Sequence, residues 1–337
     1  MTGAIIGCGR IVQDHHVPAW QALGRAAVSD WTIADPTSES RYAVQMALGV
    51  PAQHAYSDYR ALLLRERPDF AVVNSPHVSH ETIVIDCLRV GVPVLVEKPM
   101  AATLSAARRM IAVSEAEGVP LGVIHNYRSR PQSELARKLL ADGAVGRPFL
   151  YRTESLGMGW HPGAAGYDAD WRIRRAAAGG GCLLDNGYHG VYLSQDFCGT
   201  VESVFARIGA LRPGVEVEDT ALLLVTHEGG ATTSLQAAWS LGGESAAVNE
   251  IYGDEGTMRF EPDGTVAISR GSGHWDRHHA APDAGFQAVF KRFLECVQGH
   301  GVPCTTANEG LECLRVIRAA YASAQRGVPV RLADFEE

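Results

Sequence analysis

The sequence has few basic residues and no long hydrophobic run. Its 337 residues contain 30 Lys and Arg against 38 Asp and Glu, which gives a formal net charge of -8. This balance provides no electrostatic basis for binding phosphate backbones or anionic membranes, so nucleic acid is not expected as a partner. No apolar stretch approaches the roughly 20 residues that cross a bilayer, and the N-terminus leads directly into a strand. We therefore expect a cytoplasmic protein without membrane association.

The sequence also lacks C-x-x-C pairs and H-E-x-x-H motifs. The odd, scattered set of cysteines predicts reduced thiols: Cys8, Cys87, Cys182, Cys198, Cys296, Cys304 and Cys313. The pairs His15-His16 and His278-His279 have no Cys or acidic companions at ligand spacing, so we expect no metal site.

The length favours two domains. In the first part of the chain, short apolar strands alternate with amphipathic helices, which predicts a parallel sheet covered on both faces. The strands are expected at 4–7, 26–34, 70–73, 92–96 and 121–124, and the helices at 12–23, 38–48, 59–67, 80–90 and 108–117.

The sequence changes character near Phe149. The segments 221–226, 232–239 and 248–252 partly alternate between apolar and polar residues, which indicates an antiparallel sheet with one solvated face. Between the two parts, 157–181 is rich in glycine and aromatic residues and lacks periodicity, which is typical of a functional loop. Helices are predicted over 286–297 and 311–325.

A glycine-rich turn follows the first strand, with the sequence Gly7-Cys8-Gly9-Arg10-Ile11-Val12. Such a turn before a helix directs backbone N–H groups and the positive end of the helix dipole at a pyrophosphate. The third position of the G-x-G-x-x-G motif is Val12, so the motif taken alone also fits a simple turn.

Asp35, at the end of the second predicted strand, strengthens the cofactor interpretation. Its carboxylate is placed to accept hydrogen bonds from the adenosine ribose hydroxyls and to repel a 2′-phosphate, which favours NAD over NADP. Arg41 is the residue that would accommodate NADP, and a turn or helix cap before Pro36 is the alternative role of Asp35. Pro76 and Glu97-Lys98-Pro99 also follow buried strands, so they should face the cofactor at the carboxyl edge of the sheet.

Several motifs occur together: Ser75-Pro76-His77-Val78-Ser79-His80, a segment 91–99 ending in Glu-Lys-Pro, the run 179–189 (Gly-Gly-Gly-Cys-Leu-Leu-Asp-Asn-Gly-Tyr-His) and Glu218-Asp219-Thr220-Ala221. With the glycine turn and Asp35, this combination closely resembles the glucose-fructose oxidoreductase and inositol dehydrogenase family over almost the whole chain.

The resemblance implies an α/β protein of two domains. Residues 1–122 would form a Rossmann domain with a doubly wound parallel sheet that binds the dinucleotide. Residues 123–337 would form an α/β domain for substrate binding and oligomerisation, built on a large, open, mainly antiparallel sheet whose face commonly forms a subunit interface. A homodimer or homotetramer is therefore expected.

The resemblance also implies roles for individual residues. Lys98 would lie beside the nicotinamide, the peptide before Pro99 would be cis, and Asp185 and His189 would line the substrate pocket. The predicted cofactor-binding residues are Gly7, Gly9, Arg10, Ile11, Asp35, Asn74, Ser75, Pro76, His80, Glu97 and Lys98. The predicted substrate-binding residues are Tyr127, Arg128, Trp160, His161, Trp171, Arg172, Asn186 and Tyr192.

The spacing of Asp185, His189 and Tyr192 puts all three on one face of a helix. Oxidation of a secondary alcohol needs a base for the hydroxyl proton, and imidazole has a suitable pKa. We therefore expect His189 to be the general acid/base, Lys98 to stabilise charge on the reacting oxygen, and Asp185 to orient the substrate or the imidazole. Tyr192 departs from the family pattern, in which an Asp is common at this position.

These observations predict an NAD(P)-dependent oxidoreductase that transfers a hydride between nicotinamide and a sugar-like, cyclitol-like or aminosugar-like substrate. Two alternatives stay open. Some proteins of the same fold use NAD transiently to hydrolyse glycosidic bonds, and a non-catalytic NAD-binding regulator would keep the fold without the chemistry.

Overall fold

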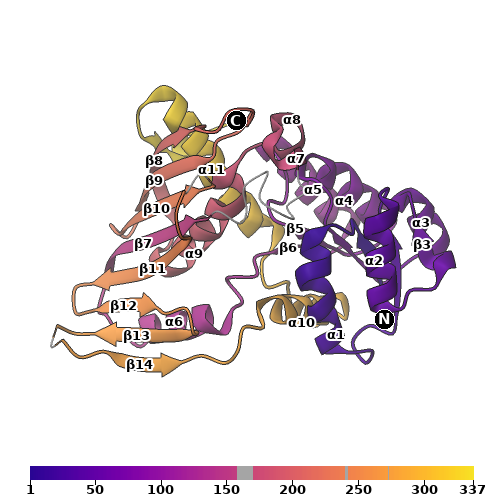
Figure 1. Cartoon of the computed structure of the whole chain (residues 1–337), viewed down its shortest axis with the longest axis horizontal. Helices are drawn as coiled ribbons and strands as arrows, with labels where there is room; N and C mark the ends of the chain where they lie inside the picture. The colour runs from indigo at the N-terminus through magenta and orange to yellow at the C-terminus, as the bar shows by residue number, and fades with distance from the viewer. Residues whose placement is uncertain (158–169, 240–241, 272) are drawn as a thin grey trace. The chain divides into compact units, whose positions relative to one another are not determined.

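The computed structural model describes residues 1–157, 170–239, 242–271 and 273–337. These form two compact units, each built on one sheet (Figure 1). The first unit comprises Met1–Ser129 together with Ala284–Leu311, and the second comprises Arg130–Asp283 together with Glu312–Glu337. The predicted functional boundary between residues 122 and 123 stays a prediction. The first compact unit ends at Ser129 and also includes the segment Ala284–Leu311, which returns from late in the chain.

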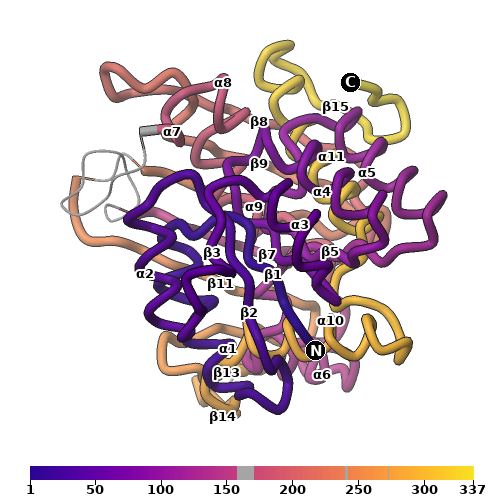
Figure 2. The backbone as a smooth tube through the Cα atoms, turned by 90° about the vertical axis from the view of Figure 1, so that its right-hand side faces the viewer, coloured from indigo at the N-terminus to yellow at the C-terminus, as the bar shows by residue number. Residues whose placement is uncertain are grey.

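The first unit contains six parallel strands. They are β1 (Thr2–Ile6), β2 (Asp30–Ala34), β3 (Ala55–Tyr56), β4 (Phe70–Val73), β5 (Val94–Glu97) and β6 (Leu121–Ile124). The order β3-β2-β1-β4-β5-β6 is that of the Rossmann fold, and the predicted parallel sheet is confirmed. β1 and β2 run side by side in Figure 2. The chain direction around the sheet reverses between β1 and β4, which is where open α/β sheets bind ligands.

Helices connect these strands as the sequence predicts, and one further helix joins the unit from late in the chain. They are η1 (Val12–His16), α1 (Val17–Leu23), α2 (Ser38–Leu48), η2 (Ala52–His54), α3 (Tyr59–Glu66), η3 (His77–Ser79), α4 (His80–Arg89), α5 (Leu104–Glu117) and α10 (Gly285–Val297). α5 shows the local reasons: the Thr103 hydroxyl accepts the Ala106 N–H at its start, and Gly118 ends it with a positive φ of 65°.

The prediction of a strand over 26–34 is wrong for its first half. The Ala27 N–H donates to the Gly24 carbonyl, which makes a turn there, and β2 begins only at Asp30. The apolar run therefore covers a turn and the buried end of a strand, a difference that composition alone does not reveal.

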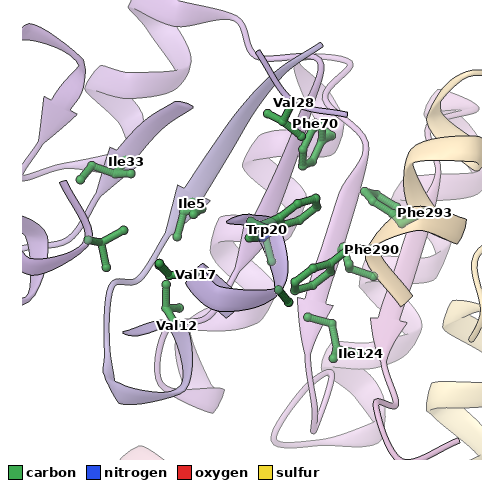
Figure 3. Close-up of a cluster of buried hydrophobic side chains, with 14 of the residues drawn as sticks. Ile5, Val12, Val17, Trp20, Val28, Ile33, Phe70, Ile124, Phe290 and Phe293 are labelled. Carbon is green, nitrogen blue, oxygen red and sulfur yellow. The ribbon is translucent and has the colours of Figure 1, made fainter. Parts of the chain in front are cut away.

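An aromatic cluster forms the core of the first unit (Figure 3). The ring of Trp20 on α1 stacks on Phe290 of α10, with centroids 4.0 Å apart and planes 1° from parallel. Phe70 of β4 contacts both Trp20 and Phe293. Since α10 follows most of the second unit in the sequence, the chain must return to complete this core.

The second unit contains nine strands in one sheet. They are β7 (Pro148–Leu156), β8 (Val201–Gly209), β9 (Thr220–His227), β10 (Thr232–Ala238), β11 (Ala246–Gly253), β12 (Thr257–Phe260), β13 (Thr265–Ser269), β14 (Asp276–His279) and β15 (Val330–Arg331). The order is β14-β13-β12-β11-β7-β10-β9-β8-β15, and β7 and β10 form the single parallel pair of these strands (Figure 1). The predicted large, mainly antiparallel sheet is confirmed.

One face of this sheet carries helices and the other is open along β9. Leu222 and Leu224 are 44% and 47% exposed, while the alternating Leu223 and Val225 are buried. The helices of the unit are α6 (Pro131–Ala141), α7 (Asp170–Ile173), α8 (Arg175–Ala178), η4 (Leu183–Gly187), α9 (Tyr188–Cys198), η5 (Leu332–Asp334) and most of α11 (Ala307–Arg326). Within the described ranges, no helix is long and apolar enough to cross a bilayer.

We expect the variant Phe290→Ala to lower the free energy of unfolding by about 3–5 kcal/mol, because it removes a fully buried ring and leaves a cavity beside Trp20. Urea unfolding followed by circular dichroism measures the change. Leu64→Ala, at a position that is 81% exposed, is the control. Equal stability of the two variants would contradict the central place of α10 in this core.

Candidate active site

The glycine turn lies where the sheet order reverses. Gly7 has a φ of +92°, and a Cβ there would lie 2.7 Å from the Asn74 carbonyl carbon. Gly9 differs, because, apart from Gly9 and its chain neighbours, no described atom lies within 4 Å of the place where its Cβ would be. The Gly9 carbonyl accepts the N–H groups of Val12 and Gln13 and so starts the following helix. Gly7 therefore serves the fold, and Gly9 leaves space at a helix N-terminus that fits a pyrophosphate.

Val12, in the position that departs from the glycine motif, is fully buried in the aromatic core of the first unit. Its side chain points away from the turn into the packing between helix and sheet (Figure 3). The departure is therefore accommodated inside the unit. Arg10 and Ile11 belong to the first turn after Gly9, at the same end of the helix.

Asp35 directly follows β2 and holds two neighbouring segments. One carboxylate oxygen accepts the N–H of Cys8 at 2.7 Å, and the other accepts the N–H of Thr37 at 2.7 Å. The Arg41 guanidinium donates to the Asp35 main-chain carbonyl. Thus Asp35 makes the turn before Pro36 and also joins the glycine turn. A carboxylate offers about four lone-pair positions, so these bonds leave acceptor capacity for ribose hydroxyls.

The segments after β4 and β5 are tied together by His80. Its Nδ1 lies 3.0 Å from the Pro99 carbonyl oxygen and its Nε2 lies 2.8 Å from that of Ser75. Burial lowers the pKa of His80, against the effect of these two acceptors. The Lys98–Pro99 peptide is cis, which confirms that prediction. Asn74, Ser75, Pro76, Glu97 and Lys98 thus lie at the carboxyl ends of adjacent strands.

Two buried histidines, His16 and His125, lie near the predicted cofactor residues although the sequence did not predict a role for them there. His16 Nε2 lies 2.9 Å from Glu97 Oε1. His125 follows β6, and burial, then the charges of Arg128 and Lys98, lower its pKa well below the usual value. The rule that located Lys98, a polar residue directly after a buried strand, would also have found His125. The His16 contact spans 81 residues and leaves no local signal.

The predicted substrate residues Tyr127 and Arg128 lie in the turn after His125, in the first unit. Arg128 Nη1 is 2.6 Å from Glu309 Oε1, near the start of α11. The Glu309 carboxylate also accepts the Thr306 N–H and hydroxyl. These contacts fix the guanidinium at the carboxyl side of the six-stranded sheet.

In the second unit, the glycine run 179–181 makes room for a close backbone contact. A Cβ on Gly181 would overlap the Glu218 carbonyl oxygen. The Glu218 carboxylate oxygen Oε1 then accepts the N–H groups of Gly181 at 2.8 Å and Leu183 at 3.1 Å, and the Tyr321 hydroxyl at 2.7 Å. Glu218 therefore caps the N-terminus of η4, and its burial raises the pKa of its carboxyl group.

The helix that follows carries the predicted catalytic residues. Its first part, η4, is π-helical and contains Asp185, whereas His189 lies on α9. π-Helical turns often occur at functional sites. The same-face prediction assumed an α-helix throughout, so the spacing argument holds only from Tyr188 onward.

Each of these polar side chains has a defined partner. Asp185 Oδ2 is 3.3 Å from Arg172 Nε, and the Arg172 guanidinium lies over the Trp171 ring. His189 Nδ1 is 2.6 Å from the Tyr192 hydroxyl. Asn186 Oδ1 accepts the Trp239 indole N–H at 2.6 Å. The ion pair joins α7 to η4, and Tyr192 sets the orientation of the half-buried imidazole. Of the predicted substrate residues, Trp160 and His161 lie outside the described residues.

Comparison with known proteins agrees with this division of residues. A model described as "Oxidoreductase family, NAD-binding Rossmann fold" matches residues 1–125, and one described as "GFO/IDH/MocA C-terminal domain" matches residues 134–259. The chain is 27% identical to D-apiose dehydrogenase of Paraburkholderia graminis over 99% of this chain and 90% of that protein. It is 28% identical to inositol 2-dehydrogenase of Rubrobacter xylanophilus over 83% and 80%.

A solved structure with the same fold is the WlbA dehydrogenase of Bordetella pertussis in complex with NADH and UDP-GlcNAcA. It has a TM-score of 0.84 and 25% identity over 98% of both chains. An oxidoreductase from Agrobacterium radiobacter has a TM-score of 0.86 at 24% identity, over 99% of this chain and 98% of that one.

The fold and the edge residues of the first unit define an NAD(P)-dependent oxidoreductase with a Rossmann domain. Because the two family models together match most of the chain, the protein belongs to the glucose-fructose oxidoreductase and inositol dehydrogenase (Gfo/Idh/MocA) family. The predicted family and fold class are confirmed. The roles of individual residues stay predictions.

The two glycines of the turn should respond differently to alanine. Gly7→Ala is expected to lower the melting temperature without cofactor, because of its positive φ and the contact with Asn74. Gly9→Ala should leave this temperature unchanged and weaken NAD binding at least tenfold, since the methyl group would occupy the cofactor space. Thermal unfolding and calorimetric titration with NAD measure the two effects. Tight NAD binding by Gly9→Ala would contradict the assignment.

Glu218 should make stability depend on pH. Because its pKa is raised in the folded state, its stabilising contribution is full below the ordinary pKa of Glu and is lost as the pH rises through the raised pKa. The wild type should therefore lose stability relative to Glu218→Gln as the pH rises from the ordinary pKa of Glu through the raised pKa of Glu218. Urea unfolding at several pH values measures the difference. Glu202→Gln, at an exposed position of β8, is the control, because it separates the effect of burying the carboxyl group from the effect of replacing Glu by Gln.

Proposed function

We propose that this protein transfers a hydride between NAD and a secondary alcohol or ketone of a sugar, a cyclitol or an aminosugar-type substrate. One observation carries the proposal. A single edge of the six-stranded sheet collects the open glycine turn, the Asp35 carboxylate and the Glu97-Lys98-Pro99 segment. This set provides, at the carboxyl ends of β1, β2 and β5, a place for the pyrophosphate, an acceptor for ribose and a cation for the reacting end.

The cofactor would be held by residues of the first unit. Gly9 leaves room for the pyrophosphate at the helix N-terminus, Asp35 would accept the ribose hydroxyls, and Lys98 would lie at the nicotinamide end. When bound, NAD supplies the hydride acceptor or donor. The carboxylate of Asp35 supports NAD over NADP, because a 2′-phosphate would meet its negative charge and Arg41 already bonds the Asp35 carbonyl.

We assign proton transfer to His189. Nδ1 of the imidazole is engaged by the Tyr192 hydroxyl, so Nε2 is the atom that would take the substrate hydroxyl proton in oxidation and return it in reduction. Lys98 would donate a hydrogen bond to the same oxygen and stabilise its developing negative charge. Asp185, paired with Arg172, would hold the guanidinium and neighbouring substrate hydroxyls in place.

The substrate class rests on the relatives and on the aromatic content of this region. The relatives named above are dehydrogenases of D-apiose and of inositol, and WlbA was solved with a nucleotide sugar. The Arg172 guanidinium lies over the Trp171 ring, which brings an aromatic ring and hydrogen-bond donors together, a combination that suits a polyhydroxylated ring. The exposed Leu222 and Leu224 on the open sheet face support a homodimer or homotetramer as the working assembly.

We expect His189→Ala to lower kcat by about 10²- to 10⁴-fold, because the proton of the substrate hydroxyl loses its acceptor. The dissociation constant for NAD should stay within about threefold of the wild-type value, since the cofactor residues lie in the other unit. The assay follows NADH absorbance with NAD or NADP against D-apiose, myo-inositol, D-xylose, levoglucosan and aminosugars. His274→Ala, an exposed histidine of the same unit, is the matched control.

Three other results would change the conclusion. Wild-type turnover in His189→Ala would remove this residue from the chemistry. Release of a sugar from a glycoside without net NADH would favour the NAD-dependent hydrolase. NAD binding with no reaction on any of these substrates or on a glycoside would favour a regulator.

A further inference from the structure

Glu97, the last residue of β5, is a carboxylate inside the protein. Glu97 is only 7% exposed. Each of its two carboxylate oxygens accepts one hydrogen bond. Oε1 lies 2.9 Å from Nε2 of His16, and Oε2 accepts the main-chain N–H of Lys98 at 3.0 Å. Burying a carboxylate is costly unless donors are fixed around it. The arrangement therefore links the helix after the glycine turn to the backbone of Lys98.

His16 is held in one orientation by aromatic rings. It is 1% exposed, and its ring centroid lies 4.9 Å from that of Phe286 and 5.1 Å from that of Phe290, both on α10. Nδ1 makes no hydrogen bond with any described residue. A neutral imidazole has one N–H, and a second one would point at apolar surroundings. The geometry thus assigns the proton to Nε2, which donates it to Glu97.

The segment is held from its other side as well. His80 contacts the Pro99 carbonyl oxygen at 3.0 Å, whereas Glu97 holds the Lys98 N–H. The backbone on both sides of the Lys98 side chain is therefore fixed by buried groups from η1 and α4. A reacting group must be held within a fraction of an ångström, and such precision depends on supports of this kind.

We propose that His16 and Glu97 form a positioning pair that fixes the backbone of Lys98 and thereby the place of its amine during hydride transfer. The inference rests on the proposed function, because it assumes that Lys98 acts on the reacting oxygen. The pair itself takes no part in the chemistry. Its contribution is the hydrogen bond that Glu97 accepts from Lys98, which depends on the carboxylate staying where His16 holds it.

The test uses three variants of the full-length protein. His16→Phe keeps an aromatic ring between Phe286 and Phe290 but removes the donor to Glu97. His16→Gln replaces the ring with an amide whose N–H can reach the carboxylate. His15→Phe is the matched control, because His15 is exposed, stacks on the same Phe286 ring and precedes His16 directly.

Crystal structures of each variant with NADH provide a readout that needs no substrate. In His16→Phe, Lys98 Nζ should be displaced by about 1 Å or more from its wild-type position, and in His16→Gln it should return. His15→Phe should leave it unchanged. Lys98 in its wild-type position in His16→Phe would overturn the proposal, as would a displacement that His16→Gln does not reverse. If His16→Phe fails to fold, Glu97→Leu takes its place: a displaced Lys98 Nζ supports the proposal, and Lys98 in its wild-type position overturns it.

Kinetics separate positioning from loss of folded protein. With the substrate that gives turnover, and per NADH-binding site, His16→Phe should lower kcat up to about 100-fold with KM for NAD nearly unchanged, and His16→Gln should restore most of it. A lower melting temperature with unchanged kcat per site would mean a purely structural pair. Lys98→Ala distinguishes the proposed role of Lys98 from the positioning role of His16 and Glu97. If Lys98→Ala retains turnover, the proposed role of Lys98 fails. If Lys98→Ala loses turnover while His16→Phe keeps it, only the positioning pair is rejected.

Discussion

A carboxyl group inside a protein must be surrounded by hydrogen-bond donors, and this constraint shapes both units. In the first unit, Glu97 gathers donors from His16 and from the backbone of Lys98. In the second, Glu218 gathers two backbone N–H groups and the Tyr321 hydroxyl at the start of η4. Each carboxyl group joins distant parts of the chain at the segment that carries a residue proposed for chemistry. The hydrogen bonds to these buried oxygens therefore fix the positions of both segments.

Close approach of main chains is the second shared feature. Gly7 meets the backbone of Asn74 at the switch point, and Gly181 meets the backbone of Glu218. A side chain at either position would push apart two segments that must touch. Each glycine is followed by a π-helical turn, η1 or η4, before an ordinary α-helix continues. The two units, which have different sheets, thus use similar local devices where a helix begins beside polar groups.

The sequence was sufficient for features that depend on local patterns. The strand-helix alternation predicted the parallel sheet, and the alternating apolar residues of β9 and β10 predicted a sheet with one open face. The carboxyl-edge rule correctly located Asp35 and Lys98 directly after strands. Contacts over long sequence distances could not be predicted: His16 with Glu97, Gly181 with Glu218, and α10 with Trp20. His15 and His16 are adjacent in the sequence but have separate surroundings, because His15 is exposed and His16 is buried against Glu97.

The return of α10 to the first unit also bears on how the protein is made. Phe290 and Phe293 belong to the core around Trp20, yet they follow Trp20 by some 270 residues. At a synthesis rate of about 5–20 residues per second, a ribosome that has finished residue 129 needs roughly 10–30 s more to produce α10. During this interval the nascent Rossmann sheet exposes the aromatic surface that α10 later covers. The nucleotide-binding half of the protein, although it is translated first, therefore cannot complete its folding until nearly the whole chain has emerged.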